Sequence, residues 1–115
     1  MQIIGALRTL GTPVVTLTDG TNIDWDMREG RIATVTLGGN RTLNNPINKY
    51  PDGFFLFVRQ DATGSRTLTF GSDYKFPGNV SPTLSTAANA LDVIHLVYDG
   101  NTLVAVANFS FGSAP

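Results

Sequence analysis

Apolar and polar residues alternate with a period of two along most of this chain. This period places successive side chains on opposite faces of the backbone, which is typical of β-strands with one face buried. Gly, Asn, Asp and Pro punctuate the alternation at short intervals, as in all-β domains. The pattern therefore predicts an all-β fold, an antiparallel β-sandwich or barrel of jelly-roll type with about eight short strands. The alternating runs are residues 14–18, 22–27, 31–37, 41–43, 53–60, 66–70, 74–76, 91–98 and 102–109.

Three of the turns contain short sequences that favour β-hairpins. Asp19-Gly20 separates the first two runs, and Gly38-Gly39-Asn40 separates the next two. Asp99-Gly100-Asn101 separates the last two runs, which are also the longest neighbouring pair. Asp-Gly and Gly-rich turns supply the positive φ angles that tight hairpins need, so we expect antiparallel pairing on both sides of each turn.

The run from residue 53 to residue 60 is apolar on both of its faces. Phe54, Leu56 and Val58 share one face, and Phe55 and Phe57 share the other. A strand of this kind is usually central and covered on both sides. We expect the second cover to be a neighbouring subunit, because a chain of 115 residues has material for only one core.

The composition excludes several classes of protein. Only 15% of the residues are charged and the net charge is −1, so the chain lacks the clustered cations of a nucleic-acid-binding protein. The absence of cysteine excludes disulfides, thiolate metal sites and thiol catalysis. No apolar run approaches the 18 or so residues of a membrane span.

Residues 59–78, RQDATGSRTLTFGSDYKFPG, carry the densest mixture of charged, aromatic and glycine residues in the chain. They match no phosphate-binding loop. The segment Asp61-Ala62-Thr63-Gly64-Ser65 has the composition of a tight connection between two strands, with a positive φ angle at Gly64. Arg59 and Arg66 flank this turn, and we expect a carboxylate such as Asp61 or Asp73 to lie between them. We interpret the stretch as the turns of β-hairpins and not as a ligand site.

A few side chains could carry chemistry, but each has a plainer interpretation. Asp24 and Asp26 share one strand face, too close together to flank a glycosidic bond; a weak calcium site is the remaining alternative to a solvated surface. His95 is the only histidine and occupies a mid-strand position with Val93 and Val97. No catalytic, metal-binding or cofactor-binding residue is predicted, and the protein is not expected to be an enzyme.

Aromatic side chains suggest either packing or recognition. The phenylalanines are more numerous than one small sandwich needs, which favours a subunit interface. Trp25, Tyr50 and Tyr74 could instead stack on sugars if they are exposed.

Several motifs occur in an order that resembles a known family. These are VVTLTDGTNIDWDM, VTLGGNRTLNNPIN, RQDATGSRTLTFGSDYKFPG and LSTAANALDVIHLVYDG. In this order, and over about residues 13–107, they resemble a small β-domain that recurs in virion proteins of tailed bacteriophages. The pair Gly78-Asn79 departs from the family pattern, which tends to have a second glycine. The resemblance implies a trimeric structural module without catalytic residues, located in the virion.

We divide the chain into an N-terminal arm (1–13), a β-sandwich domain (14–111) and a C-terminal tail (112–115). The expected partners are two further copies of the chain in a homotrimer and the major capsid protein, without nucleic acid, cofactor or membrane span. The predicted trimer-interface residues are Phe55, Phe57, Trp25 and His95. The predicted capsid-binding arm residues are Ile3, Ile4, Leu7 and Leu10.

Two functions follow from this division. The first is a capsid decoration (cement) protein that stabilises the assembled head by binding only the lattice. The alternative is a receptor-binding tail-fibre tip or head fibre. In that case loops 44–52, 61–65, 71–82 and 99–101 would contact a host receptor or glycan.

Overall fold

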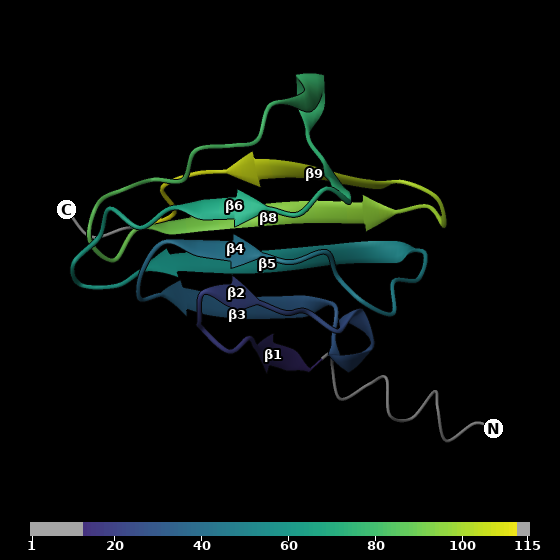
Figure 1. Cartoon of the computed structure of the whole chain (residues 1–115), viewed down its shortest axis with the longest axis horizontal. Coiled ribbons are helices and arrows are strands. Elements are labelled where there is room, and N and C mark those ends of the chain that lie inside the picture. Colours follow the sequence, from purple (N-terminus) through teal and green to yellow (C-terminus); the bar gives the residue numbers. More distant parts are fainter. Residues whose placement is uncertain (1–12, 113–115) are drawn as a thin grey trace.

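A computed structural model describes residues 13–112 as two stacked β-sheets (Figure 1). The larger sheet has six strands in the order β1-β3-β5-β8-β9-β7, and the smaller has three in the order β2-β4-β6. Two short 3-10 turns and no α-helix occur among the described residues. The all-β prediction is therefore confirmed. The strands are β1 (Val14–Thr16), β2 (Asn22–Ile23), β3 (Ile32–Leu37), β4 (Arg41–Leu43), β5 (Asp52–Gln60), β6 (Leu68–Phe70), β7 (Tyr74–Lys75), β8 (Leu91–Tyr98) and β9 (Leu103–Asn108); the 3-10 turns are η1 (Met27–Glu29) and η2 (Pro77–Asn79).

The first six strands pair in parallel, which corrects the expected antiparallel arrangement. Strands β1, β3 and β5 lie side by side in the large sheet, and β2, β4 and β6 lie side by side in the small one. The chain passes from one sheet to the other and back, so each pair of strands forms one coil of a short solenoid (Figure 1). Parallel neighbours need a long crossover connection, and here the short strand of the opposite sheet belongs to that crossover.

The turns at Asp19-Gly20 and Gly38-Gly39-Asn40 are consequently not hairpins. Each connects a strand of the large sheet to a strand of the small one. The Asp19 carboxylate accepts hydrogen bonds from the Gly38 amide (3.1 Å) and the Arg41 guanidinium (2.8 Å), and so joins the turns of two successive coils. Turn composition alone does not distinguish a reversal within one sheet from a passage between two sheets.

The sequence has no visible repeat, although the structure has a repeated coil. The Cα register pairs Val14 with Ile32 and Ile32 with Phe55 in the large sheet. In the small sheet it pairs Asn22 with Thr42 and Thr42 with Thr69. The spacings differ from coil to coil because the connecting loops differ in length, and a fixed period is therefore absent.

The hairpin predicted at Asp99-Gly100-Asn101 is confirmed. Strands β8 and β9 pair antiparallel, and β8 also pairs antiparallel with β5. Gly100 has a φ of 97°, a conformation that glycine adopts without strain. Strand β7 completes the large sheet by pairing in parallel with β9.

The core lies between the two sheets and follows the alternation closely. Phe54, Leu56 and Val58 point inward from β5, as the sequence predicts. Trp25 contacts Phe54 edge to face, with ring centroids 6.0 Å apart, and Tyr50 packs against the same phenylalanine at 5.2 Å. Strand β5 lies between β3 and β8, so its predicted central position is also confirmed.

A polar ladder joins the turns that follow β4 and β6. The Asn45 side chain accepts a hydrogen bond from the Asp73 amide (2.7 Å) and donates one to the Ser72 hydroxyl (3.3 Å). A Cβ atom at Gly71 would lie 2.8 Å from the Asn45 backbone nitrogen, and Cβ atoms almost never come within 3.0 Å of a heavy atom elsewhere in the chain. Only glycine therefore fits where these two turns approach each other.

Replacing Gly71 with alanine should destabilise the fold by about 1–3 kcal/mol, because the added methyl group must push the two turns apart. Gly20→Ala is the matched control, since its Cβ would meet only the Asn22 carbonyl oxygen at an ordinary 3.7 Å. Urea unfolding of both variants measures the difference. Equal midpoints for Gly71→Ala and Gly20→Ala would contradict the close approach.

Candidate binding surfaces

The turns gather at the two ends of the molecule. Two of the four loops expected to contact a receptor, and the start of a third (71–82), lie at the same end. The loop 44–52, the turn that leads from β6 into β7 and the β8–β9 turn at 99–101 lie at the right-hand end in Figure 1. The loop 61–65 lies at the opposite end, because β5 runs the other way (Figure 1). The fold therefore separates this loop from these three segments.

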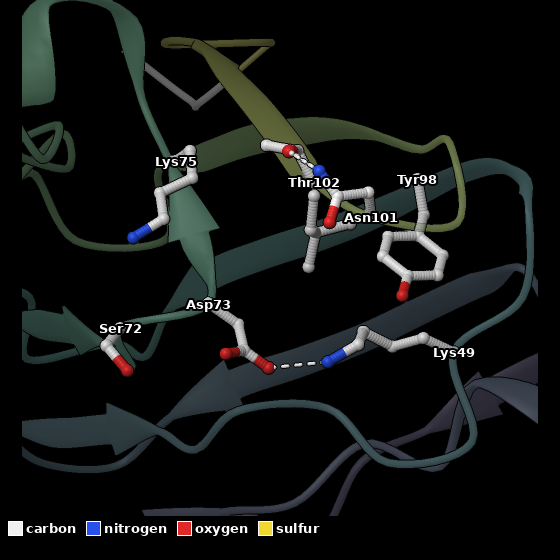
Figure 2. A pocket seen from close by; sticks show the side chains of 8 residues that line it. Lys49, Ser72, Asp73, Lys75, Tyr98, Asn101 and Thr102 are labelled. Atoms are coloured by element: carbon white, nitrogen blue, oxygen red, sulfur yellow. Dashed lines mark hydrogen bonds and ion pairs between the residues drawn. The ribbon is translucent and has the colours of Figure 1, made fainter.

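The three loops at the right-hand end border a pocket of about 220 Å³. The pocket is lined mainly by polar and charged side chains, with one aromatic ring (Figure 2). Its lining residues are Lys49, Ser72, Asp73, Lys75, Tyr98, Asn101, Thr102 and Leu103.

An ion pair spans this pocket and fixes two of its walls relative to each other. Lys49 Nζ lies 2.6 Å from the Asp73 carboxylate, and both side chains are partly exposed (Figure 2). The same ammonium group lies 5.6 Å from the centre of the Tyr98 ring, within the range of a cation–π contact. The pair ties the loop after β4 to the turn before β7, which are far apart in sequence.

The Asp99 side chain holds the β8–β9 turn in one conformation. Its carboxylate accepts hydrogen bonds from the backbone amides of Thr102 (2.7 Å) and Asn101 (2.8 Å). These two hydrogen bonds lower the pKa of Asp99 below its ordinary value. The polar groups of Asn101 and Thr102 are thereby held at the rim of the pocket.

The turn at residues 61–65 is structural, as the sequence analysis concluded. Asp61 accepts hydrogen bonds from the Thr63 and Gly64 amides, each at 3.0 Å, and Gly64 has a φ of 74°. The Arg66 guanidinium donates to Asp61 at 2.9 Å, and this hydrogen bond is the main reason why the pKa of Asp61 is lowered. Arg59 instead donates to Thr34, so the two arginines are held apart. The turn leads from one sheet to the other and is not a hairpin.

The carboxylates of Asp24 and Asp26 also serve the fold. Asp24 accepts a hydrogen bond from the Asn44 side chain at 2.9 Å, between successive coils. Asp26 accepts from the Arg28 amide, at the start of η1, and from the Asn48 side chain, each at 3.0 Å. The hydrogen bond from Asn48 is the main cause of the lowered pKa of Asp26.

The calcium site considered for these carboxylates is not supported by a cluster of acidic side chains among residues 13–112. No group of three or more His, Asp or Glu side chains in that range lies close enough together to hold a metal ion.

No helix among residues 13–112 is long and apolar enough to cross a membrane.

The outer face of the large sheet is apolar, and it brings together three of the four predicted interface residues. Phe55 and Phe57 are half-buried there, and the Phe55 ring stacks on His95 with centroids 4.7 Å apart. Three valines of β8 and β9 continue this face and remain 43–49% exposed: Val97, Val104 and Val106. We call this surface the outer apolar face.

Trp25 is not part of the outer apolar face. It is 1% exposed and packs in the core between the sheets, so it has no surface to offer to another subunit. Alternation placed Trp25 with Ile23 and Met27, and the structure shows that this shared face points inward. The predicted arm residues lie outside the described part of the chain: Ile3, Ile4, Leu7 and Leu10.

The aromatic side chains considered for sugar stacking are mostly unavailable. Trp25 and Tyr74 are buried, and Tyr50 packs against Phe54. Tyr74 donates a hydrogen bond to the Asn44 carbonyl, and burial raises the pKa of its hydroxyl. Tyr98 is also half-buried and packs against the core, but its ring lines the pocket, and the sequence analysis missed it. Its position directly before Asp99-Gly100 was the available signal, because the last residue of a strand lies beside the turn.

Residues 13–112 form an all-β domain whose conspicuous polar side chains mainly stabilise turns. Residues 12–103 match the family described as "Putative phage tail fibre C-terminal domain". The match covers most of the chain, which therefore belongs to this family. The protein is a bacteriophage structural protein located in the virion. No curated protein and no solved structure matches the chain.

Proposed function

We propose that this protein is an attachment domain of a phage tail fibre and that it binds a receptor on the host surface. The family match supports the tail-fibre alternative over the capsid decoration function that the sequence analysis placed first. The decoration function rested mainly on an N-terminal arm, of which residues 1–12 lie outside the described part of the chain. The proposed activity is binding without catalysis.

The convergence of three loops on one pocket is the observation that carries this proposal. Loops from β4, β6 and the β8–β9 hairpin supply its walls, and a rigid two-sheet scaffold holds them in place. Recognition sites are commonly built from loops on such scaffolds. We assign no receptor contact to the opposite end of the molecule, which carries the loop 61–65. The Asp61 and Asp19 side chains there accept hydrogen bonds that hold turns together.

Attachment can be tested with the purified chain and the bacterial host of the phage. We expect the fluorescently labelled chain to bind host cells and, in excess, to slow adsorption of the phage. Asn101→Arg places a bulky side chain at the pocket rim and should reduce cell binding about tenfold or more, equivalent to at least about 1.4 kcal/mol. Thr63→Arg, at the opposite end, is the matched control. A wild-type chain that neither binds cells nor slows adsorption would refute attachment.

We also propose that the domain functions as a homotrimer assembled through the outer apolar face. Phe55, Phe57 and His95 lie on this face, and the exposed valines extend it to the edge of β9. A second depression, of about 280 Å³, lies on this face, where His95 and the three valines meet Phe76 and Pro77. An exposed apolar surface that contains such a depression favours contact with another protein over contact with water. A second and third copy of the chain are the occupants that we propose.

A further inference from the structure

We infer that the pocket between Lys49 and Thr102 binds a sugar unit that bears an acidic group, such as a uronic acid of a surface polysaccharide. This inference rests on the proposed attachment function and specifies its ligand. No carboxylate pair suited to cleaving a sugar lines the pocket, which contains Asp73 as its single acidic residue. The site would therefore hold the sugar and leave it intact.

The pocket offers the mixture of groups that a sugar requires. A sugar ring presents hydroxyl groups at its rim and carbon-bound hydrogens on its faces. Ser72, Asn101 and Thr102 supply hydroxyl and amide groups at the pocket wall, and the Tyr98 ring supplies an apolar surface (Figure 2). A concave site with an apolar wall and a few polar groups that fix orientation is the usual form of a small-molecule site.

The charge of the lining favours an acidic sugar over a neutral one. Lys49 and Lys75 are cationic, whereas Asp73 is the only anionic side chain that lines the pocket. Asp73 is paired with Lys49, and no ion pair involves Lys75 among residues 13–112. The pocket thus has one excess positive charge in a chain whose net charge is −1. A carboxylate on the sugar would pair with Lys75 and receive a charge-assisted hydrogen bond.

The scaffold also holds the binding groups in place before a ligand arrives. Asp99 fixes the turn that carries Asn101 and Thr102, and the Lys49–Asp73 pair fixes the facing wall. A site that is already ordered loses less conformational entropy on binding, which matters for a ligand as small as one sugar unit.

The test is NMR titration of the isotope-labelled full-length chain with four methyl glycosides. Two are acidic, the glucuronide and the galacturonide, and two are their neutral parents, which have a hydroxymethyl group in place of the carboxylate. We expect at least one acidic glycoside to shift the amide signals of Asn101 and Thr102 with a Kd of about 1–10 mM, a normal range for single sugars bound by few contacts. Each neutral parent should bind about tenfold more weakly, and added salt should reduce the difference.

Two variants locate the site. Tyr98→Leu keeps an apolar side chain but removes the ring, and Lys75→Gln removes the charge; each should weaken binding of the acidic glycoside about tenfold. Arg28→Gln removes one positive charge from η1, away from the pocket lining, and should leave binding unchanged.

The outcomes separate this inference from the attachment function. Absence of pocket shifts with both acidic glycosides at about 20 mM, well above the expected Kd, would overturn the inference. Equal binding of acidic and neutral glycosides would overturn it as well, as would full binding by Tyr98→Leu or Lys75→Gln. If the chain still binds host cells in any of these cases, attachment stands and the ligand is of another class.

Discussion

The variant Phe54→Ala loses about 3–5 kcal/mol of unfolding free energy, the usual cost of truncating a fully buried aromatic side chain. Phe54 is 0% exposed and lies near the middle of the core. Its ring makes edge-to-face contacts with both Trp25 and Tyr50, so its loss removes two aromatic contacts as well as buried area. A domain of ordinary stability has only about 5–15 kcal/mol in total, so this variant should be close to unfolding at 37 °C.

Chemical denaturation followed by tryptophan fluorescence measures this loss, because Trp25 is the only tryptophan and is in contact with Phe54. Phe109→Ala is the matched control, since Phe109 is 46% exposed and its truncation should cost less than about 1 kcal/mol. All variants should be compared at one protein concentration, because association contributes to apparent stability. Equal losses for the two alanine variants would contradict the assignment of the inner face of β5 to the core.

The variant Phe57→Asp should convert the proposed homotrimer to monomers. Phe57 lies on the outer face of β5, at the register position opposite Thr34 on one side and Val93 on the other. A carboxylate there would be buried in each of the three interfaces, at a cost of several kcal/mol per site. The Arg59 guanidinium on the same face is already hydrogen-bonded to Thr34. Sedimentation velocity at micromolar concentration measures the change directly.

Two further variants make this experiment decisive. Val106→Asp changes a side chain that is already 44% exposed, so it tests the interface with little risk to the fold of the protomer. Thr69→Asp adds the same charge to the small sheet, at an exposed position of β6, and should leave the trimer intact. A wild-type monomer, or trimers that persist in both Phe57→Asp and Val106→Asp, would refute assembly through the outer apolar face.

The inward and outward positions of the long strands were predictable from sequence because the side-chain period of a strand is fixed by its backbone. Phe54 and Leu56 were assigned correctly to one face and Phe55 to the other. Strand direction was not predictable in the same way. Asp19-Gly20 has the composition of a hairpin turn, and only the pairing of β1 with β3 and of β2 with β4 shows that the chain passes to a second sheet there.

The candidate site was likewise predictable from sequence only in part. The segments 44–52, 71–82 and 99–101 were identified as loops from their Pro, Gly and Asn content. The first and last of them meet the start of the 71–82 segment at the pocket. Their convergence depends on the direction of β4, β6 and β8, which local composition does not encode. Trp25 was assigned to an interface because one shared face of a strand does not reveal whether a partner or the protein's own second sheet covers it.

The sequence by itself determined an all-β chain, the inner and outer faces of its strands, and the structural role of its charged turns, because these depend on neighbours within a few residues. The tertiary structure alone decided the parallel coils, the burial of Trp25 and the pocket that joins Lys49, Asp73 and Tyr98. These features depend on contacts between residues 18 or more positions apart, which no local pattern specifies.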